Sequence, residues 1–234
     1  MEEQPLVTCL CLTMAGRSEF LKRAVECFAR QTYPHKELLI VADSWKDAAA
    51  ILDSDGMVRV GSNISVYVTA EKCNIGRKRN LGIESAGGSD LIAIFDDDDF
   101  SAPNRLDFQV QSLQVSQKAV TGFQVCKFTD GASWWQYRAG AGFVVGSSLC
   151  FRRDWWAAHT FPEIQIGEDV QFCDVAHSAR ELAMCPDMDL MYATIHGGNT
   201  SLRRPEDHPH NYTSLPGYSW KERDLRIVDA YSKA

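Results

Sequence analysis

The sequence predicts an α/β fold, in which helices cover both faces of a mostly parallel β-sheet. In the first hundred residues, short apolar runs rich in β-forming residues alternate with segments whose apolar residues recur at helical spacing. Such alternation is typical of parallel strands joined by helical crossovers. The chain has 234 residues, of which 45% are apolar, so a single domain over residues 1–234 can bury a self-sufficient core.

Each apolar run of the first hundred residues is expected to form a strand, and each following segment a helix. The expected strands cover residues 6–12, 37–42, 64–69 and 91–95. The expected helices cover residues 18–28, 48–52 and 76–86. Ser18 is expected to cap the first helix, whose apolar face consists of Phe20, Leu21, Ala24, Val25 and Phe28.

The pattern changes after Pro103 to a mixed region that is rich in aromatic residues. A helix is expected over residues 104–114, and another from Glu168 to about Arg180. Strands are expected near residues 119–128, 143–151 and 190–195. The tail from residue 203 is polar and becomes weakly helical after Ser219. Because the sequence contains no internal repeat and no linker, one domain is predicted.

Charge and apolar patterning exclude several classes of protein. The 24 basic residues are outnumbered by 31 acidic ones, giving a net charge of −7. General nucleic-acid affinity is therefore not expected, since it rests on clustered Lys and Arg. No run reaches the roughly 18 apolar residues of a transmembrane helix, and the N-terminus lacks the features of a signal peptide. The sequence thus predicts a cytoplasmic protein without a transmembrane segment.

The eight cysteines lie in scattered apolar segments, and none belongs to a Cys-x-x-Cys pair. This spacing gives no support to a zinc ribbon or to thioredoxin chemistry. In a reducing compartment such cysteines are expected to act as small core residues.

Four consecutive aspartates, Asp96 to Asp99, directly follow the apolar run 91–95. Adjacent like charges repel one another, and limited solvent increases the cost. A divalent cation relieves that repulsion, and oxygen ligands suit Mg²⁺ or Mn²⁺. A solvated turn that caps the next helix is the alternative. The position at the end of a buried strand favours metal binding.

Three other positions carry candidate functional groups. Asp43 ends the second strand, Glu168 and Asp169 open a helix, and His196 lies in a glycine-rich loop. Taken one at a time, these residues are compatible with a turn, a helix cap and a structural loop histidine. Ligands of parallel sheets bind beyond the carboxyl ends of the strands, so Asp43 and the aspartates are expected at one edge.

Together these segments resemble the family 2 glycosyltransferases, over about residues 6–201. The resemblance rests on segments 7–13 and 27–34 (Cys-Phe-Ala-Arg-Gln-Thr-Tyr-Pro), 74–83 (Asn-Ile-Gly-Arg-Lys-Arg-Asn-Leu-Gly-Ile), 96–99, 146–155 and 167–172 (Gly-Glu-Asp-Val-Gln-Phe). The chain departs from the family pattern at Ala42, where a second acidic residue is common, and at Leu12, where proline is common. The absence of a Gln-x-x-Arg-Trp motif argues against a processive membrane-embedded synthase.

The resemblance implies the GT-A fold, a Rossmann-like sheet flanked by helices with a smaller mixed acceptor-side region. The nucleotide-sugar half would cover about residues 1–100, the acceptor-side half about 101–202 and a C-terminal tail 203–234. The implied reaction is metal-dependent, inverting transfer of a sugar from a nucleotide diphosphate-sugar, UDP being the usual carrier, to an acceptor hydroxyl. Mn²⁺ or Mg²⁺ would be the cofactor.

The resemblance also implies roles for individual residues of this sequence. Asp98 would be the main metal ligand, with Asp96 and His196 close by. Asp169 would be the catalytic base, with Glu168 as the second candidate. The residues implied in nucleotide-sugar binding are Thr13, Ala15, Arg17, Asp43, Asn74, Arg79, Asp96 and Asp97. The residues considered for acceptor binding are Trp134, Trp135 and Ser147, and Tyr137 is considered with the two tryptophans for stacking on sugar rings. At least one of the adjacent tryptophans must face away from the core if they lie on a strand.

Two other functions remain open at this stage. A nucleotidyltransferase would carry a glycine-rich phosphate loop after the first strand, where this sequence has the single glycine Gly16. A non-catalytic nucleotide-sugar-binding module would be indicated by loss of the aspartates or the base, and both are present. The acceptor is equally open: a lipid-linked glycan, a protein, a small metabolite or a modified nucleobase.

Overall fold

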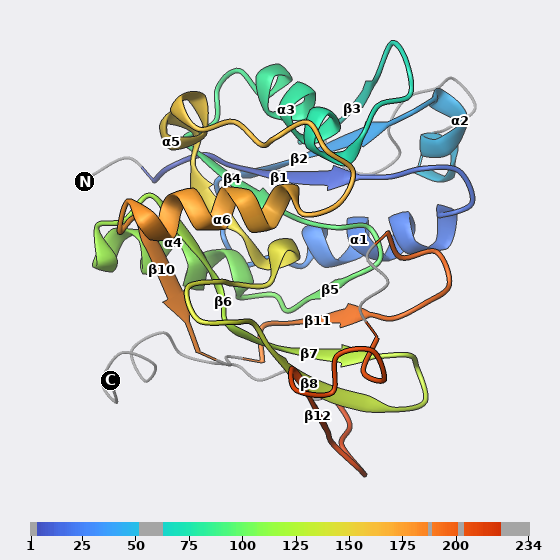
Figure 1. Ribbon diagram of the computed structural model, residues 1–234. Coiled ribbons are helices and arrows are strands. Elements are labelled where there is room, and N and C mark those ends of the chain that lie inside the picture. Colours follow the sequence, from blue (N-terminus) through green and yellow to red (C-terminus); the bar gives the residue numbers. More distant parts are fainter. Residues whose placement is uncertain (1–3, 52–62, 187–188, 201–203, 221–234) are drawn as a thin grey trace.

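The computed structural model describes residues 4–51, 63–186, 189–200 and 204–220. Within these residues the strands form a seven-stranded sheet of order β10-β6-β9-β4-β1-β2-β3 and a five-stranded sheet of order β12-β8-β7-β11-β5. Figure 1 shows the smaller sheet below the larger one, with α1 between the two at the edge where β1 ends.

The larger sheet consists of β1 (Val7–Leu12), β2 (Lys36–Ala42), β3 (Ile64–Val68), β4 (Leu91–Ile94), β6 (Val120–Phe123), β9 (Cys150–Arg152) and β10 (Leu182–Cys185). The smaller sheet consists of β5 (Phe100–Ser101), β7 (Val125–Thr129), β8 (Trp134–Arg138), β11 (Met191–Thr194) and β12 (Tyr212–Ser214). The α-helices are α1 (Ser18–Ala29), α2 (Trp45–Ala48), α3 (Ile75–Ser85), α4 (Arg105–Ser116), α5 (Arg153–Ala158) and α6 (Glu168–Ser178). Short 3₁₀ turns are η1 (Ala49–Ile51) and η2 (Gly146–Ser148).

The predicted sheet with helices on both faces is confirmed. The neighbouring strands β4, β1, β2 and β3 run parallel, as do β6 and β10, and β9 runs antiparallel between β4 and β6. Side chains alternate along β1, so Cys9 and Cys11 join a core cluster with α1 and α4, while Leu10 joins one with α3, α5 and α6.

The chain passes from the larger sheet to the smaller one between β6 and β7, across the single residue Gln124. In the smaller sheet β7 pairs with both β8 and β11, and β11 pairs in turn with β5, which follows the aspartates of segment 96–99. This connection places the smaller sheet beside the carboxyl ends of β1 and β4. The two sheets therefore enclose the edge at which the functional groups were expected.

The structure differs from the sequence predictions mainly in short elements. Arg17 occupies the N-cap position of α1, so Ser18 is the first helical residue and does not cap. The strand expected over residues 143–151 is limited to β9. Before it, Gly142 adopts a φ of 81° and the Ser148 hydroxyl donates to the carbonyl of Val145, which favours a turn.

The sequence patterns also missed β5, β8, β10, β12 and α5, each of at most six residues. The helical stretch expected at 48–52 starts earlier, as α2 and η1, and its last residue lies outside the described residues. The helical tail expected after Ser219 also falls almost wholly outside them.

The cysteine prediction is confirmed. All eight cysteines are free, and seven of them are buried; Cys73 is partly exposed. Among the described residues, none of the helices combines the length and the apolar character needed to cross a bilayer.

Asn80 on α3 anchors the segment between α5 and α6. Its side-chain amide donates to the carbonyl of Phe161 (2.8 Å), and its oxygen accepts from the Phe161 amide (3.0 Å) and from the indole N–H of Trp156 (3.0 Å). All these groups are buried, so each depends on Asn80 for its hydrogen bond. The contact fixes the chain that leads to the start of α6.

Asn80→Ala is expected to lower the free energy of unfolding by about 2–4 kcal/mol, because it leaves two buried N–H groups and a carbonyl unpaired. Urea denaturation monitored by circular dichroism measures the change. Glu84→Ala, an exposed substitution on the same helix, is the control and should change stability little. An Asn80→Ala protein as stable as the control would contradict the anchoring role.

Candidate active site

A cleft of about 890 Å³ lies between the carboxyl ends of β1, β2 and β4 and the smaller sheet. It is lined by residues from the loop after β1, the end of β2, helix α3, the aspartates, the η2 turn and the start of α6. The far end is lined by Phe128, Tyr137 and Tyr212 from the smaller sheet. The cleft therefore brings together chain segments from the first strand to the last.

The aspartates give the cleft a concentrated negative charge. Asp97 is 1% exposed, and Asp98 and Asp99 are each 8% exposed. Burial raises the pKa of Asp96 to about 6, and the charges of its acidic neighbours add to the shift against the opposing effect of Arg79. Burial also raises the pKa values of Asp97 and Asp99. A positive group is thus favoured at this position.

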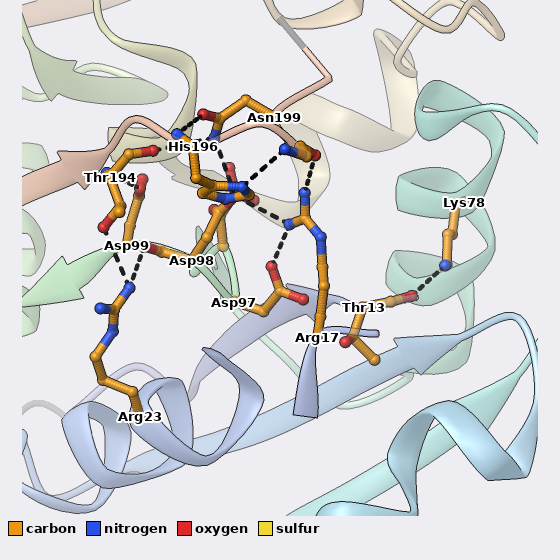
Figure 2. Close-up of polar contacts among 12 residues, drawn as sticks. Thr13, Arg17, Arg23, Lys78, Asp97, Asp98, Asp99, Thr194, His196 and Asn199 are labelled. Atoms are coloured by element: carbon orange, nitrogen blue, oxygen red, sulfur yellow. Dashed lines mark hydrogen bonds and ion pairs between the residues drawn. The ribbon is translucent and has the colours of Figure 1, made fainter. Parts of the chain in front are cut away.

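Two arginines of the α1 region supply part of that positive charge (Figure 2). The guanidinium of Arg17 donates to Asp97 Oδ1 (2.6 Å) and Asp98 Oδ2 (2.9 Å) through Nη1, and to the carbonyl of Gly198 (2.6 Å) through Nη2. Arg23 donates to the backbone carbonyl of Asp98 and to the hydroxyl of Thr194 (3.2 Å). The two side chains tie the aspartates to the loop that follows β11.

His196 lies in that loop and contacts the same carboxylate as Arg17. Its Nε2 is 3.0 Å from Asp98 Oδ2, while its Nδ1 accepts a hydrogen bond from the Gly198 amide (3.0 Å). An acceptor at Nδ1 places the proton of the neutral ring on Nε2, so the ring donates to Asp98. The ring also stacks on Phe20, with centroids 4.6 Å apart.

The donor set fits a divalent cation that is completed by a substrate. Among the described residues, no cluster of three or more His, Cys, Asp or Glu side chains forms a protein-only metal site. Mg²⁺ is usually held by one or two carboxylates together with substrate phosphates rather than by a protein cage. The buried, negatively charged Asp98 matches that requirement. For His196 to bind the ion through Nε2, the neutral ring would carry its proton on Nδ1 instead and give up its contacts with Asp98 and the Gly198 amide.

At the β2 end of the cleft, Asp43 forms an ion pair with Lys78 of α3. The Lys78 ammonium lies 2.8 Å from Asp43 Oδ1 and donates to the carbonyl of Thr13 (2.6 Å). Lys78 is 5% exposed, and all three residues line the cleft. A carboxylate acceptor and an ammonium donor therefore lie side by side at this end.

The first two residues of α6 have different surroundings. Glu168 is 4% exposed and lies 2.8 Å from Arg79 Nη1, and burial raises its pKa while Arg79 opposes the shift. Asp169 lines the cleft, and its Oδ1 accepts a hydrogen bond from the amide of Val170 (2.8 Å). Arg79 also approaches Asp96 Oδ1 at 4.0 Å.

The structure brings most of the predicted site residues to this cleft. The predicted residues that line it are Thr13, Arg17, Asp43, Arg79, Asp96, Asp97, Asp98, Ser147, Glu168 and Asp169. Ala15, Asn74, Trp134, Trp135 and His196 are not among the lining residues. Asn74 instead caps α3, where its side chain accepts from the Arg77 amide (2.9 Å) and donates to the Glu163 carbonyl (2.8 Å).

The two adjacent tryptophans lie on β8 and point to opposite faces of the smaller sheet, as the alternation of a strand requires. Trp134 packs edge-on against Tyr192 and Tyr218, with centroids 5.1 and 5.3 Å apart. Trp135 packs against the core cluster that includes Tyr137. Both rings are thus engaged in packing within the protein.

Sequence reasoning missed Lys78 and, at the aromatic end of the cleft, Phe128 and Tyr212; Tyr137 was considered for stacking on an acceptor sugar. Lys78 lies between two arginines in Arg-Lys-Arg, and helical spacing alone does not say which of three adjacent basic residues faces Asp43. Tyr137 and Tyr212 come from β8 and β12, which were not predicted as strands. In the structure β8 and β12 pair with Tyr137 opposite Tyr212, and this pairing brings the two rings together.

Comparisons with known proteins agree with this arrangement. The model of the glycosyl transferase family 2 matches residues 9–178. A comparison with curated proteins gives no significant match. Among solved structures, S. aureus TarS 1-349 in complex with UDP-GlcNAc is similar, with a TM-score of 0.65 and 17% identity over 86% of this chain and 63% of that one.

Two further TarS structures are similar at the same level. The complex of TarS 1-349 with UDP has a TM-score of 0.63 and 16% identity, over 88% of this chain and 62% of that one. S. aureus TarS itself has a TM-score of 0.62 and 16% identity, over 81% of this chain and 37% of that one. The similarity covers less than two thirds of each TarS chain, and at this identity it shows a common fold.

Proposed function

The chain belongs to glycosyl transferase family 2, and we propose on this basis that it transfers a sugar from a UDP-linked donor to an acceptor hydroxyl, with inversion at the anomeric carbon. The observation that carries the proposal is the single cleft that holds the Asp43–Lys78 pair, the aspartates and Asp169. These groups match the three parts of the reaction: a nucleobase, a diphosphate leaving group and a hydroxyl nucleophile.

The Asp43–Lys78 pair provides hydrogen-bonding partners for a nucleobase such as uracil. Uracil presents an N–H flanked by two carbonyl oxygens, so it needs an acceptor and a donor side by side. The Asp43 carboxylate and the Lys78 ammonium provide this pair 2.8 Å apart. Adenine, cytosine and guanine also place a donor beside an acceptor, so the proposal of a uridine carrier rests on the UDP and UDP-GlcNAc complexes of the similar TarS structures.

The aspartates and Arg17 would form the diphosphate side of the site. Asp98 is the residue that would hold Mn²⁺ or Mg²⁺, with Asp96 and Asp97 next to it. When bound, the ion stabilises the negative charge that develops on the leaving diphosphate. Arg17 is 2.9 Å from Asp98 Oδ2, so it fixes that carboxylate and lies where it can also contact a phosphate.

Asp169 is the residue that we assign as the base. Glu168 is buried against Arg79, which engages its carboxylate and leaves it poorly placed to take a proton. Asp169 lies on the cleft wall, and its Oδ2 is not engaged by the Val170 amide. A base must lie within hydrogen-bond reach of the acceptor hydroxyl, directly or through one water, and the position of Asp169 on the cleft wall favours it.

The acceptor would bind at the smaller-sheet end of the cleft, near Ser147 and the aromatic residues Phe128, Tyr137 and Tyr212. Aromatic faces suit the apolar face of a sugar ring. A glycan, a glycan-bearing protein or lipid, a small metabolite and a modified nucleobase all remain candidate acceptors. Trp134 and Trp135 would influence the acceptor through the packing of β8.

We propose a cytoplasmic location for the protein, as the sequence predicts.

Asp43→Ala is expected to weaken UDP binding by about 10–100-fold, because it removes a charged hydrogen-bond acceptor. Isothermal titration calorimetry with UDP, in the presence and absence of Mn²⁺, measures the effect. The dependence on Mn²⁺ should persist, since the diphosphate side is intact. Glu71→Ala, an exposed substitution shortly before α3, is the control. Wild-type UDP affinity in Asp43→Ala would exclude the base-recognition role.

Asp98→Ala is expected to abolish the strengthening of UDP binding by Mn²⁺, because the ion loses its main protein ligand. The measurement compares UDP affinity with Mn²⁺ and with a chelator. Asp154→Ala changes an exposed carboxylate on α5 and should leave the effect of Mn²⁺ intact. A response to Mn²⁺ that is equal in Asp98→Ala and wild type would overturn the metal assignment.

Asp169→Asn is expected to lower sugar transfer by roughly two to four orders of magnitude while UDP-sugar binding and stability persist. Gly167 occupies the N-cap of α6, and Asn at position 169 keeps an oxygen that can accept from the Val170 amide, so a structural role predicts no loss of activity. Release of UDP from a panel of UDP-sugars with Mn²⁺ measures turnover, and Asp174→Asn, exposed on the same helix, is the control.

Two results would contradict the proposal. If the Asp169→Asn protein binds donor and retains near-normal turnover, Asp169 is not the base. If the wild-type protein releases sugar or UDP from no nucleotide-sugar, the transferase function itself is wrong and the non-catalytic binding module becomes the better interpretation.

A further inference from the structure

We propose that Gly146 is a positioning residue, whose missing side chain creates the space in which the Asp169 carboxylate lies. The catalytic part of this inference rests on the proposed function, in which Asp169 is the base. The steric part is independent of it. Gly146 begins the η2 turn, Asp169 is the second residue of α6, and both line the cleft.

The contact between the two residues leaves no room for a Cβ atom at position 146 unless the Asp169 side chain moves. A Cβ atom built on Gly146 would lie 1.8 Å from Asp169 Oδ2, 2.7 Å from its Cγ and 2.9 Å from its Cβ. The three nearest atoms therefore all belong to the Asp169 side chain. At Gly140, earlier in the same loop, an added Cβ would meet only an ordinary contact of 3.7 Å with Phe143.

Backbone conformation does not explain the glycine. The glycines with a left-handed φ are Gly16, Gly131, Gly142, Gly167 and Gly217, and Gly146 is not one of them. An L-residue at position 146 is therefore compatible with the backbone, and close approach is the remaining reason for a glycine there. The close approach is to the carboxylate that we assign as the base.

The turn that carries Gly146 is held on several sides. Arg105, which is fully buried, donates to the carbonyl of Ser147 (2.9 Å), and Gln109 donates to the carbonyl of Ser148 (2.6 Å). The Ser148 hydroxyl donates to the Val145 carbonyl (2.6 Å) and accepts from the Phe123 amide (2.7 Å). These bonds oppose a shift of the backbone at the turn.

The Asp169 side chain is the more mobile partner. Its carboxylate is joined to α6 by rotatable single bonds and accepts a hydrogen bond from Val170 of the same helix. A methyl group at position 146 should therefore displace the carboxylate rather than the turn. Misplacement of a catalytic group by about 1 Å can cost about 100-fold in rate.

The steric coupling can be tested without any activity measurement, by a double-mutant cycle on thermal stability. Gly146→Ala is expected to lower the Tm of the wild-type protein by at least about 2 °C through overpacking. In an Asp169→Ala background the same change should lower the Tm by clearly less, because the two closest clashing atoms, Oδ2 and Cγ of Asp169, are absent and only the 2.9 Å contact with the Cβ atom remains. Gly87→Ala, where an added Cβ meets nothing within 4 Å, is the matched control.

The positioning role is tested by transfer and by donor binding together. Gly146→Ala is expected to reduce transfer about 100-fold and to leave UDP affinity close to that of the wild type. In an Asp169→Asn background it should cause no further loss, because the base that it displaces is already disabled. A purely structural defect would lower UDP affinity and transfer in both backgrounds.

Three results would overturn the inference. Equal Tm losses in the wild-type and Asp169→Ala backgrounds would show that Gly146 and Asp169 are not coupled. A Gly146→Ala protein with full transfer, or one whose UDP affinity falls in parallel with transfer, would exclude the positioning role. If the wild type transfers no sugar from any donor, the catalytic part fails with the proposed function, and the stability cycle alone decides the steric part.

Discussion

The burial of adjacent carboxyl groups at the end of β4 is the constraint on which the rest of the site depends. Like charges packed at this density are unfavourable in a poorly solvated cleft, and positive or donating groups must approach them. Arg17 comes from the N-cap and Arg23 from the middle of the first helix, and His196 and Asn199 come from the loop after β11. Segments far apart in the sequence converge on the site because they supply the positive and hydrogen-bond-donating groups that stabilise the buried carboxylates.

A second buried charge fixes the frame behind the aspartates. Arg105 is 0% exposed, and it donates to the carbonyls of Ile94 and Ser147 and to the hydroxyl of Ser101. It thereby links the end of β4, the start of the smaller sheet and the η2 turn. A buried guanidinium is tolerated here because its donors meet fixed oxygens, and its removal would free all three segments at once.

The sequence could predict which edge of the sheet carries the functional groups. It could not predict which side chains of each helix or strand face the cleft. Asp43 and the aspartates follow buried strands, and the carboxyl ends of parallel strands meet, so their proximity followed from local patterns. Lys78 depends on the rotation of α3 against β2, and the orientation of Trp134 depends on a strand that pairs with distant β12. These orientations are set by packing between segments that are distant in the sequence. The periodicity of a short segment carries no information about that packing.

The adjacent acids at the start of α6 show how one helix end can contact two sides of the cleft. Successive residues on a helix point about 100° apart, so Glu168 and Asp169 face different surroundings. Glu168 meets Arg79, which also approaches Asp96, whereas Asp169 faces Gly146 of the η2 turn. The ion pair between Glu168 and Arg79 holds the start of α6 to α3, and that anchoring fixes where the next residue presents its carboxylate to the cleft.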